Sequence, residues 1–116
     1  MAKYRIATRD DIVAYYGNVP STMKAVAVLD GETIVAIGGI AHEKGVIKMF
    51  MDMQDEAVNY PVTLVKAARK VMQIARESGY RLIYAQASDE LISAPRFLQR
   101  LGFEPMNIEG IYQWRS

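Results

Sequence analysis

Few side chains in this sequence could carry out chemistry. It contains no cysteine, which excludes thiolate nucleophiles, disulfides and cysteine-ligated metal. Its single histidine, His42, has no carboxylate cluster at ligand spacing beside it, so we expect no metal site. Proton transfer remains, and Asp52, Glu56 or His42 could act as the base. The phenols of Tyr60 and Tyr84 could act as proton donors.

The composition indicates one small globular domain. The 116 residues fit a single domain, so we expect no boundary within 1–116. A chain of this length buries roughly two-thirds of its unfolded surface. Apolar residues make up 51% and charged residues 23%, which is ordinary for a soluble protein and argues against disorder.

Charge and hydropathy exclude two classes of partner. The 14 Lys and Arg nearly balance 13 Asp and Glu, so the excess positive charge of a nucleic-acid binder is missing. The N-terminus lacks the apolar stretch of a signal peptide, and no apolar run approaches the roughly 20 residues that span a bilayer. We therefore expect a cytoplasmic protein that binds neither nucleic acid nor membrane.

The hydrophobic pattern predicts alternating strands and helices. Strands are expected at 4–7, 23–29, 33–41, 46–53 and 81–85, with a closing hairpin around 107–110. Helices are expected to begin at Thr8, Pro61 and Ala94, and to end at Gly17, Gly79 and Gly102. Asp30-Gly31 predicts a tight antiparallel hairpin, whereas strand, helix and strand across 46–85 predict a parallel βαβ unit. The fold class is thus α/β (α+β), a mixed central sheet with helices on both faces.

Three local patterns refine this picture. Gly38-Gly39 predicts a bulge, or a place where another backbone or a ligand comes close. Alternation along the strand at 46–53 places three methionines on one face, Met49, Met51 and Met53. One face of the first helix carries Ile12, Tyr15 and Tyr16.

The element order and three motifs resemble the GNAT superfamily of acyl-CoA N-acyltransferases. Residues 4–11 (YRIATRDD) are similar to its opening strand and helix start, and residues 35–39 (VAIGG) to its third strand. Residues 93–104 (SAPRFLQRLGFE) are similar to its last helix and the Leu-Gly-Phe-Glu exit. Within the superfamily the chain looks closest to short GNAT-like proteins encoded by tailed phages, which implies a location in the host cytoplasm.

The resemblance implies an acyltransferase that moves an acetyl group from acetyl-CoA to an amine of a small molecule or protein. In this family acetyl-CoA lies where the βαβ strands splay apart, and its pyrophosphate binds backbone amides at the start of the crossover helix. The corresponding cofactor-binding residues are Met51, Met53, Ala57, Val58, Asn59, Tyr60, Ser93, Phe97 and Arg100. The implied catalytic candidates are Tyr84, Tyr60 and Asp52.

The sequence departs from the family pattern in two places. The loop at 54–60 has no glycine, Pro61 lacks an N–H, and Asp55 and Glu56 add negative charge, which predicts weak or altered acetyl-CoA binding. The tyrosine that protonates the leaving thiolate in many members corresponds to Leu98. Tyr84 or Tyr60 would then have to supply the phenol.

These departures keep a second hypothesis open. The chain could be a catalytically degenerate GNAT-fold phage protein that acts as a binding, virion-assembly or host-interaction module. A homodimer is also possible, through an edge strand or the aromatic tail at 112–114.

Overall fold

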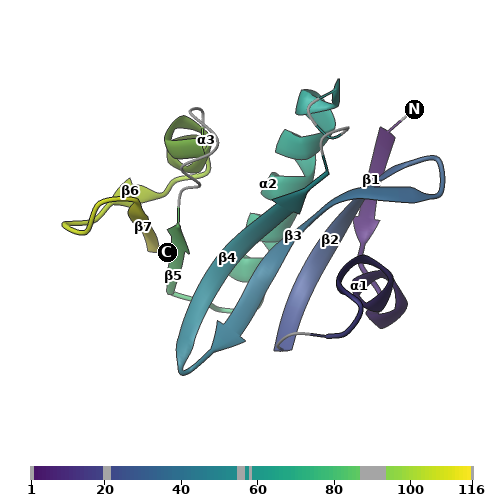
Figure 1. Cartoon of the computed structure of the whole chain (residues 1–116). Helices are drawn as coiled ribbons and strands as arrows, with labels where there is room; N and C mark the ends of the chain where they lie inside the picture. The colour runs from purple at the N-terminus through teal and green to yellow at the C-terminus, as the bar shows by residue number, and fades with distance from the viewer. Residues whose placement is uncertain (1, 20–21, 55–56, 58, 87–93, 116) are drawn as a thin grey trace.

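The computed structural model describes residues 2–19, 22–54, 57, 59–86 and 94–115. Within these residues the chain forms a seven-stranded sheet of order β1-β2-β3-β4-β5-β7-β6 (Figure 1). The strands are β1 (Ala2–Ile6), β2 (Thr22–Asp30), β3 (Thr33–Glu43), β4 (Val46–Met53), β5 (Leu82–Gln86), β6 (Glu104–Pro105) and β7 (Ile111–Arg115). The helices are α1 (Arg9–Tyr16), α2 (Pro61–Glu77) and α3 (Ala94–Arg100).

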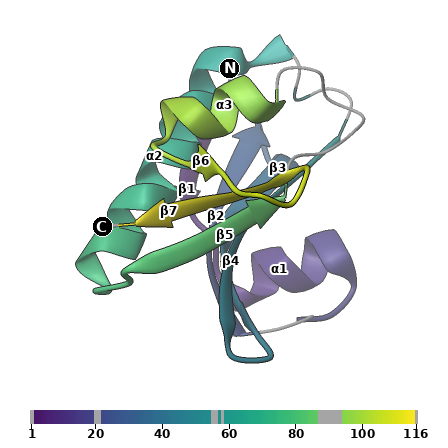
Figure 2. The same cartoon turned by 90° about the vertical axis from the view of Figure 1, so that its left-hand side faces the viewer.

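The sheet is mixed, as the sequence predicts. β4 and β5 are parallel and α2 connects them, whereas every other neighbouring pair is antiparallel. The two faces of the sheet carry separate cores. On one face α1 packs on a small cluster that contains Ile12, Ala25 and Ile37. On the other, α2 and α3 contribute to the main core, so helices cover both faces (Figure 2).

Helix α1 begins as its sequence predicts. The side chain of Thr8 accepts a hydrogen bond from the N–H of Asp11, and the Asp11 carboxylate accepts one from the N–H of Thr8. The guanidinium of Arg5 in β1 pairs with the same carboxylate at 2.9 Å. At the other end Gly17 has a φ of 84°, which favours glycine and stops the helix.

Replacing Asp11 by asparagine is expected to destabilise the fold at neutral pH and much less in acid. Burial by itself would raise the pKa of the Asp11 carboxyl, but the N–H of Thr8 and the charge of Arg5 outweigh burial and lower it. A lowered pKa means stability that is present above the unfolded value of about 3.9 and is lost as the pH falls below it. Urea unfolding at several pH values should show the two proteins converging below this pH. Asp10→Asn is the matched control, and an equal loss there would contradict the assignment.

The close packing of β2 against β3 explains one glycine and corrects one prediction. The prediction of a bulge at Gly38-Gly39 is wrong, because the register of the β2–β3 pair shifts between Val28 and Leu29 instead. The predicted close backbone approach is confirmed, since a Cβ on Gly39 would lie 2.2 Å from the carbonyl oxygen of Lys24. Only a residue without a side chain fits there.

Helix α2 has the strongest division between faces. Its inner face carries small and flexible apolar residues that are buried against the sheet, namely Ala67, Ala68, Val71, Met72 and Ala75. Its outer face is cationic. No helix in the described part of the chain is long and apolar enough to cross a membrane.

Candidate acyl-transfer site

The parallel pair β4 and β5 separates soon after it forms. Pairing joins Lys48 with Tyr84 and Met49 with Ala85, and β4 then continues to Met53 while paired to β3 on its other side. Among the described residues, the last four of β4 have no strand partner on the β5 side. Figure 1 shows the two strands moving apart. A backbone edge of this kind can pair with an extended ligand.

The two faces of β4 have different surroundings beside this edge. Met49, Met51 and Met53 pack toward the main core, which confirms that they share one face. Phe50 packs in the small core beneath α1, and Asp52 lies on the same side by alternation. The only carboxylate of β4 therefore projects from the segment that β5 leaves unpaired.

Two adjacent tyrosines of α1 surround Asp52. The hydroxyl of Tyr16 donates a hydrogen bond to Asp52 Oδ2. The ring of Tyr15 packs edge-on against that of Tyr16, with 5.0 Å between centroids. Both tyrosines also pack on the small core with Phe50. The result is a carboxylate that is accessible to solvent on one side and bounded by aromatic rings on the other.

Burial, together with Asp52, raises the pKa of both phenols and keeps them protonated. Burial, followed by the hydrogen bond to Asp52 and its negative charge, raises the pKa of Tyr16 far above the ordinary value of 10.0. Burial and the charge of Asp52 also raise the pKa of Tyr15, while a hydrogen bond with Gln54 partly offsets the rise. The Tyr16 hydroxyl therefore acts as a fixed donor that orients the carboxylate, and Asp52 retains a second oxygen that can accept a proton.

Among the described residues, the structure brings neither Tyr84 nor His42 to Asp52. Tyr84 lies on the same sheet face by its pairing with Lys48, but Lys48 is about 13 Å from Asp52 along β4. His42 pairs with Ile47, about 17 Å along the strand from Asp52, and bonds to the hydroxyl of Tyr80 at 2.5 Å.

The phenol of Tyr60 is held at a different place in the fold. Its hydroxyl donates to Asp30 Oδ2 at 2.6 Å, which ties the start of α2 to the end of β2. This hydrogen bond, with smaller effects of burial and the charge of Asp30, raises the pKa of Tyr60. Because β2 is separated from β4 by β3, this hydroxyl points away from the edge of β4 that faces β5.

The loop before α2 already uses several of its backbone donors. Ala57 is fully buried, and its N–H donates to the carbonyl of Gln54 at 3.0 Å. The N–H of Tyr60 donates to the carbonyl of Ala57, also at 3.0 Å, and Pro61 has none to offer. Asn59 is exposed. The predicted residues Val58 and Ser93, together with Asp55 and Glu56, lie outside the described residues.

Helix α3 contributes packing rather than a hydroxyl. Phe97 is half-buried against the main core, Leu98 is a member of it, and Arg100 is exposed in the last turn. Leu101 and Phe103 are also buried, so the Leu-Gly-Phe exit closes the core. Leu98, the position that the sequence resemblance matched to a tyrosine, is therefore a core position in this chain.

Replacing Leu98 by tyrosine is consequently expected to cost stability without creating a proton donor. Leu98 is 7% exposed, and a larger ring with a hydroxyl would overpack the contact by about 1–3 kcal/mol. Thermal unfolding measures the loss, and Leu98→Met is the volume-matched control. A stable Leu98→Tyr protein with increased acetyl transfer would show that this side chain can reach the site.

Comparison with known proteins shows the fold. No protein-family model matches the sequence. No curated protein matches it either. Among solved structures, the N-acetyltransferase from Staphylococcus aureus Mu50 matches with a TM-score of 0.76 at 11% identity, covering 99% of this chain and 98% of that one. yncA from Salmonella typhimurium, solved with its cofactor acetyl-CoA, also gives 0.76, at 10% identity over 98% and 93%.

A third match has a stated substrate. The ribosomal-protein-S18-alanine N-acetyltransferase from Escherichia coli gives a TM-score of 0.70 at 10% identity, over 99% of this chain and 94% of that one. Together with the mixed seven-stranded sheet, these matches show that the chain has the fold of GNAT-family acetyltransferases.

Sequence reasoning did not identify Tyr15 and Tyr16 as part of the site. Their shared helical face could be read from the spacing, and the structure confirms that they pack together against the sheet. The spacing of the tyrosines along the helix could not indicate that they face β4. The useful signal was the pair of adjacent tyrosines on a short helix that follows the first strand.

Proposed function

We propose that this protein is an acetyl-CoA-dependent N-acyltransferase in which Asp52 is the general base. The observation that carries the proposal is the position of Asp52 on the part of β4 beyond its pairing with β5, held there by Tyr16. A carboxylate in this position can take the proton that an attacking amine must lose. Tyr15, Tyr16 and Phe50 would contact the apolar part of the acceptor.

The residues along the unpaired edge fit the acyl donor better than those at the start of α2. Acetyl-CoA would supply the activated acetyl group. The backbone of Met51 and Met53 offers an edge for its extended arm, and Phe97 and Arg100 would flank it from α3. Among the described residues of the loop before α2, the N–H groups of Ala57 and Tyr60 are bonded within the loop and would not be free to bind the pyrophosphate. We therefore expect weaker binding than a glycine-rich loop would provide.

The overall reaction moves one proton from the amine nitrogen to the thiolate sulfur as the C–S bond breaks and the C–N bond forms. Asp52 accepts the proton from nitrogen. Tyr84 is our candidate for the donor to sulfur, because it pairs with β4 one residue before the pairing ends. Since its partner Lys48 is about 13 Å from Asp52 along β4, the phenol would deliver the proton through bridging water. Tyr60 is a weaker candidate, since its hydroxyl is bonded to Asp30.

Calorimetry and a thiol-release assay test the proposal. Acetyl-CoA up to millimolar concentration should give saturable heat, and a panel of primary amines should include one that releases free thiol. A flat titration would rule out the enzyme in this form. Tyr84→Phe should slow release with little change in binding, whereas Tyr60→Phe should affect stability more than rate.

A second candidate function is a non-catalytic GNAT-fold binding module. It is favoured by the burial of Leu98 where a proton donor would be expected. One structural neighbour, the AtaT Y144F toxin, is bound to the C-terminus of the antitoxin AtaR as well as to acetyl-CoA, at a TM-score of 0.59 and 12% identity over 98% of this chain and 92% of that one. Saturable acetyl-CoA binding without turnover of any amine would support this alternative.

A further inference from the structure

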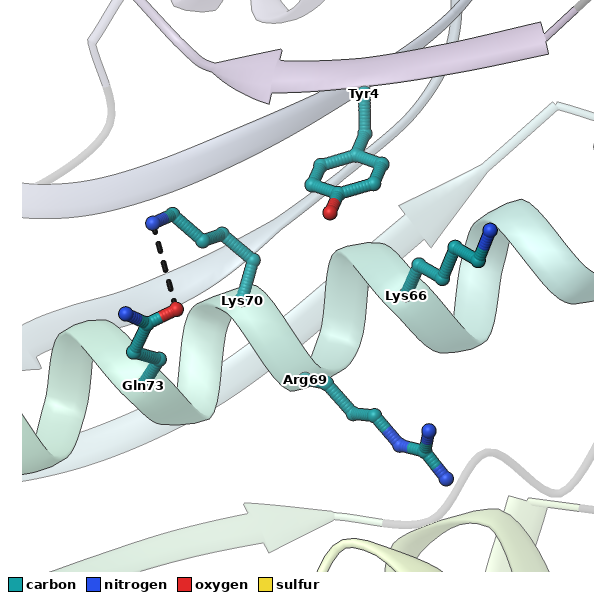
Figure 3. Close-up of a pocket in the computed structure, with 5 residues that line it drawn as sticks. All are labelled: Tyr4, Lys66, Arg69, Lys70 and Gln73. Carbon is teal, nitrogen blue, oxygen red and sulfur yellow. Dashed lines mark hydrogen bonds between the residues drawn. The ribbon is translucent and has the colours of Figure 1, made fainter.

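A cationic cavity lies between α2 and the edge strand β1, away from the unpaired edge of β4. It has a volume of about 200 Å³ and is lined by Tyr4, Lys66, Arg69, Lys70 and Gln73. Tyr4 comes from β1, the edge strand, which is three positions from β4 in the sheet. Figure 3 shows the Tyr4 hydroxyl pointing from β1 toward α2, between Lys66 and Lys70.

The described residues place no paired carboxylate beside the cations of this cavity. Among the described residues, no carboxylate forms a salt bridge with Lys66, Arg69 or Lys70. Lys70 reaches only the neutral amide oxygen of Gln73, at 3.4 Å. The nearest acid along the helix, Glu77, accepts a hydrogen bond from Gln73 at 2.9 Å.

This arrangement costs the helix stability when the cavity is empty. Lys66 and Lys70 are four residues apart, and like charges at this spacing destabilise a helix. At physiological ionic strength, charges more than about 8 Å apart are screened from one another. Distant acidic residues, which bring the net charge of the chain close to zero, therefore do not relieve the repulsion between the two lysines. A bound anion would relieve it.

We infer that this cavity is a binding site for one phosphate group of a small ligand. Two ammonium groups and a phenol offer several hydrogen-bond donors from two elements. In Figure 3 the flexible side chains of Lys66 and Lys70 extend to either side of the Tyr4 hydroxyl, while Arg69 adds charge from the other side of α2. The volume of about 200 Å³ is below the roughly 300–1,000 Å³ of cavities that enclose whole drug-sized ligands. The site therefore takes a phosphate group and leaves the rest of the ligand in solvent.

An NMR titration with inorganic phosphate, at constant ionic strength against chloride, tests the inference. Saturable amide shifts are expected at residue 4 and across 66–73. The double variant Lys66→Gln, Lys70→Gln should weaken binding about fivefold or more, because two charge-assisted contacts are removed. Tyr4→Phe should weaken it less. The matched control is Lys44→Gln, Lys48→Gln, which removes two exposed lysines in and beside the turn between β3 and β4 and should leave binding unchanged.

Two results would overturn the inference. The first is a linear, non-saturating response, or equal weakening in both double variants. The second is competition, in which saturating acetyl-CoA raises the apparent Kd for phosphate, since the cavity would then belong to the coenzyme site. If acetyl-CoA does not bind at all, the proposed function fails while the phosphate titration still decides this site. Folding is not at risk, because the double variant removes a repulsion and should unfold no earlier in chloride.

Discussion

Replacing Asp52 by asparagine is expected to lower kcat/KM for amine acetylation by at least about 100-fold, the lower end of what a positioned general base contributes. Asparagine keeps the shape of the side chain and can still accept a hydrogen bond from Tyr16, but it cannot take a proton. Binding of acetyl-CoA, measured by calorimetry, should remain within about twofold, because the carboxylate faces α1 rather than the main core.

The matched control is Glu32→Gln, which removes an exposed carboxylate in the turn between β2 and β3. It should change neither rate nor binding. Unchanged turnover in Asp52→Asn, with turnover present in the parent protein, would show that Asp52 is not the base. Tyr16→Phe adds a second readout, because loss of the donor that orients the carboxylate should lower kcat while leaving acetyl-CoA binding unchanged.

Replacing Gly39 by alanine is expected to destabilise the protein by at least about 3 kcal/mol, a large share of the 5–15 kcal/mol that small domains possess. The added Cβ would lie 2.2 Å from the Lys24 carbonyl oxygen and 2.8 Å from the Cα of Ala25. Both are backbone atoms of β2, so the sheet itself would have to move. Urea unfolding monitored by circular dichroism measures the loss, and a protein that fails to fold meets the same expectation.

Gly38→Ala is the matched control on the neighbouring residue. Its Cβ would lie 3.2 Å from Met51 Cε, the end of a flexible side chain, and 3.2 Å from the carbonyl oxygen of Phe50. We expect a smaller loss, of about 1–2 kcal/mol. Similar costs for both variants would mean that β2 and β3 are farther apart at Gly39 than described.

Features set by neighbours in the chain were readable from the sequence. The capping box of Thr8 and Asp11, the Asp30-Gly31 hairpin and the start of α2 at Pro61 all appear where they are expected. Each depends on backbone conformation or a hydrogen bond within a few residues, so its signal is local. The methionine face of β4 follows equally directly from strand alternation.

Features set by contacts between distant residues were not readable. Asp52 was a candidate base by residue type, yet nothing in the spacing indicated that Tyr16, 36 positions earlier, would hold it. Tyr60 and Tyr84 were equal candidates as phenols until the fold tied Tyr60 to Asp30 and placed Tyr84 beside the end of the β4–β5 pairing.

The sequence by itself thus determined the order of elements, their caps and the faces that they bury, because these follow from short-range geometry and periodicity. The tertiary structure alone decided which side chains share a site. β4 and β5 part after two residue pairs, and α1 packs so that its tyrosines meet Asp52. Both depend on how whole elements pack across the sheet, and no spacing along the chain encodes that distance.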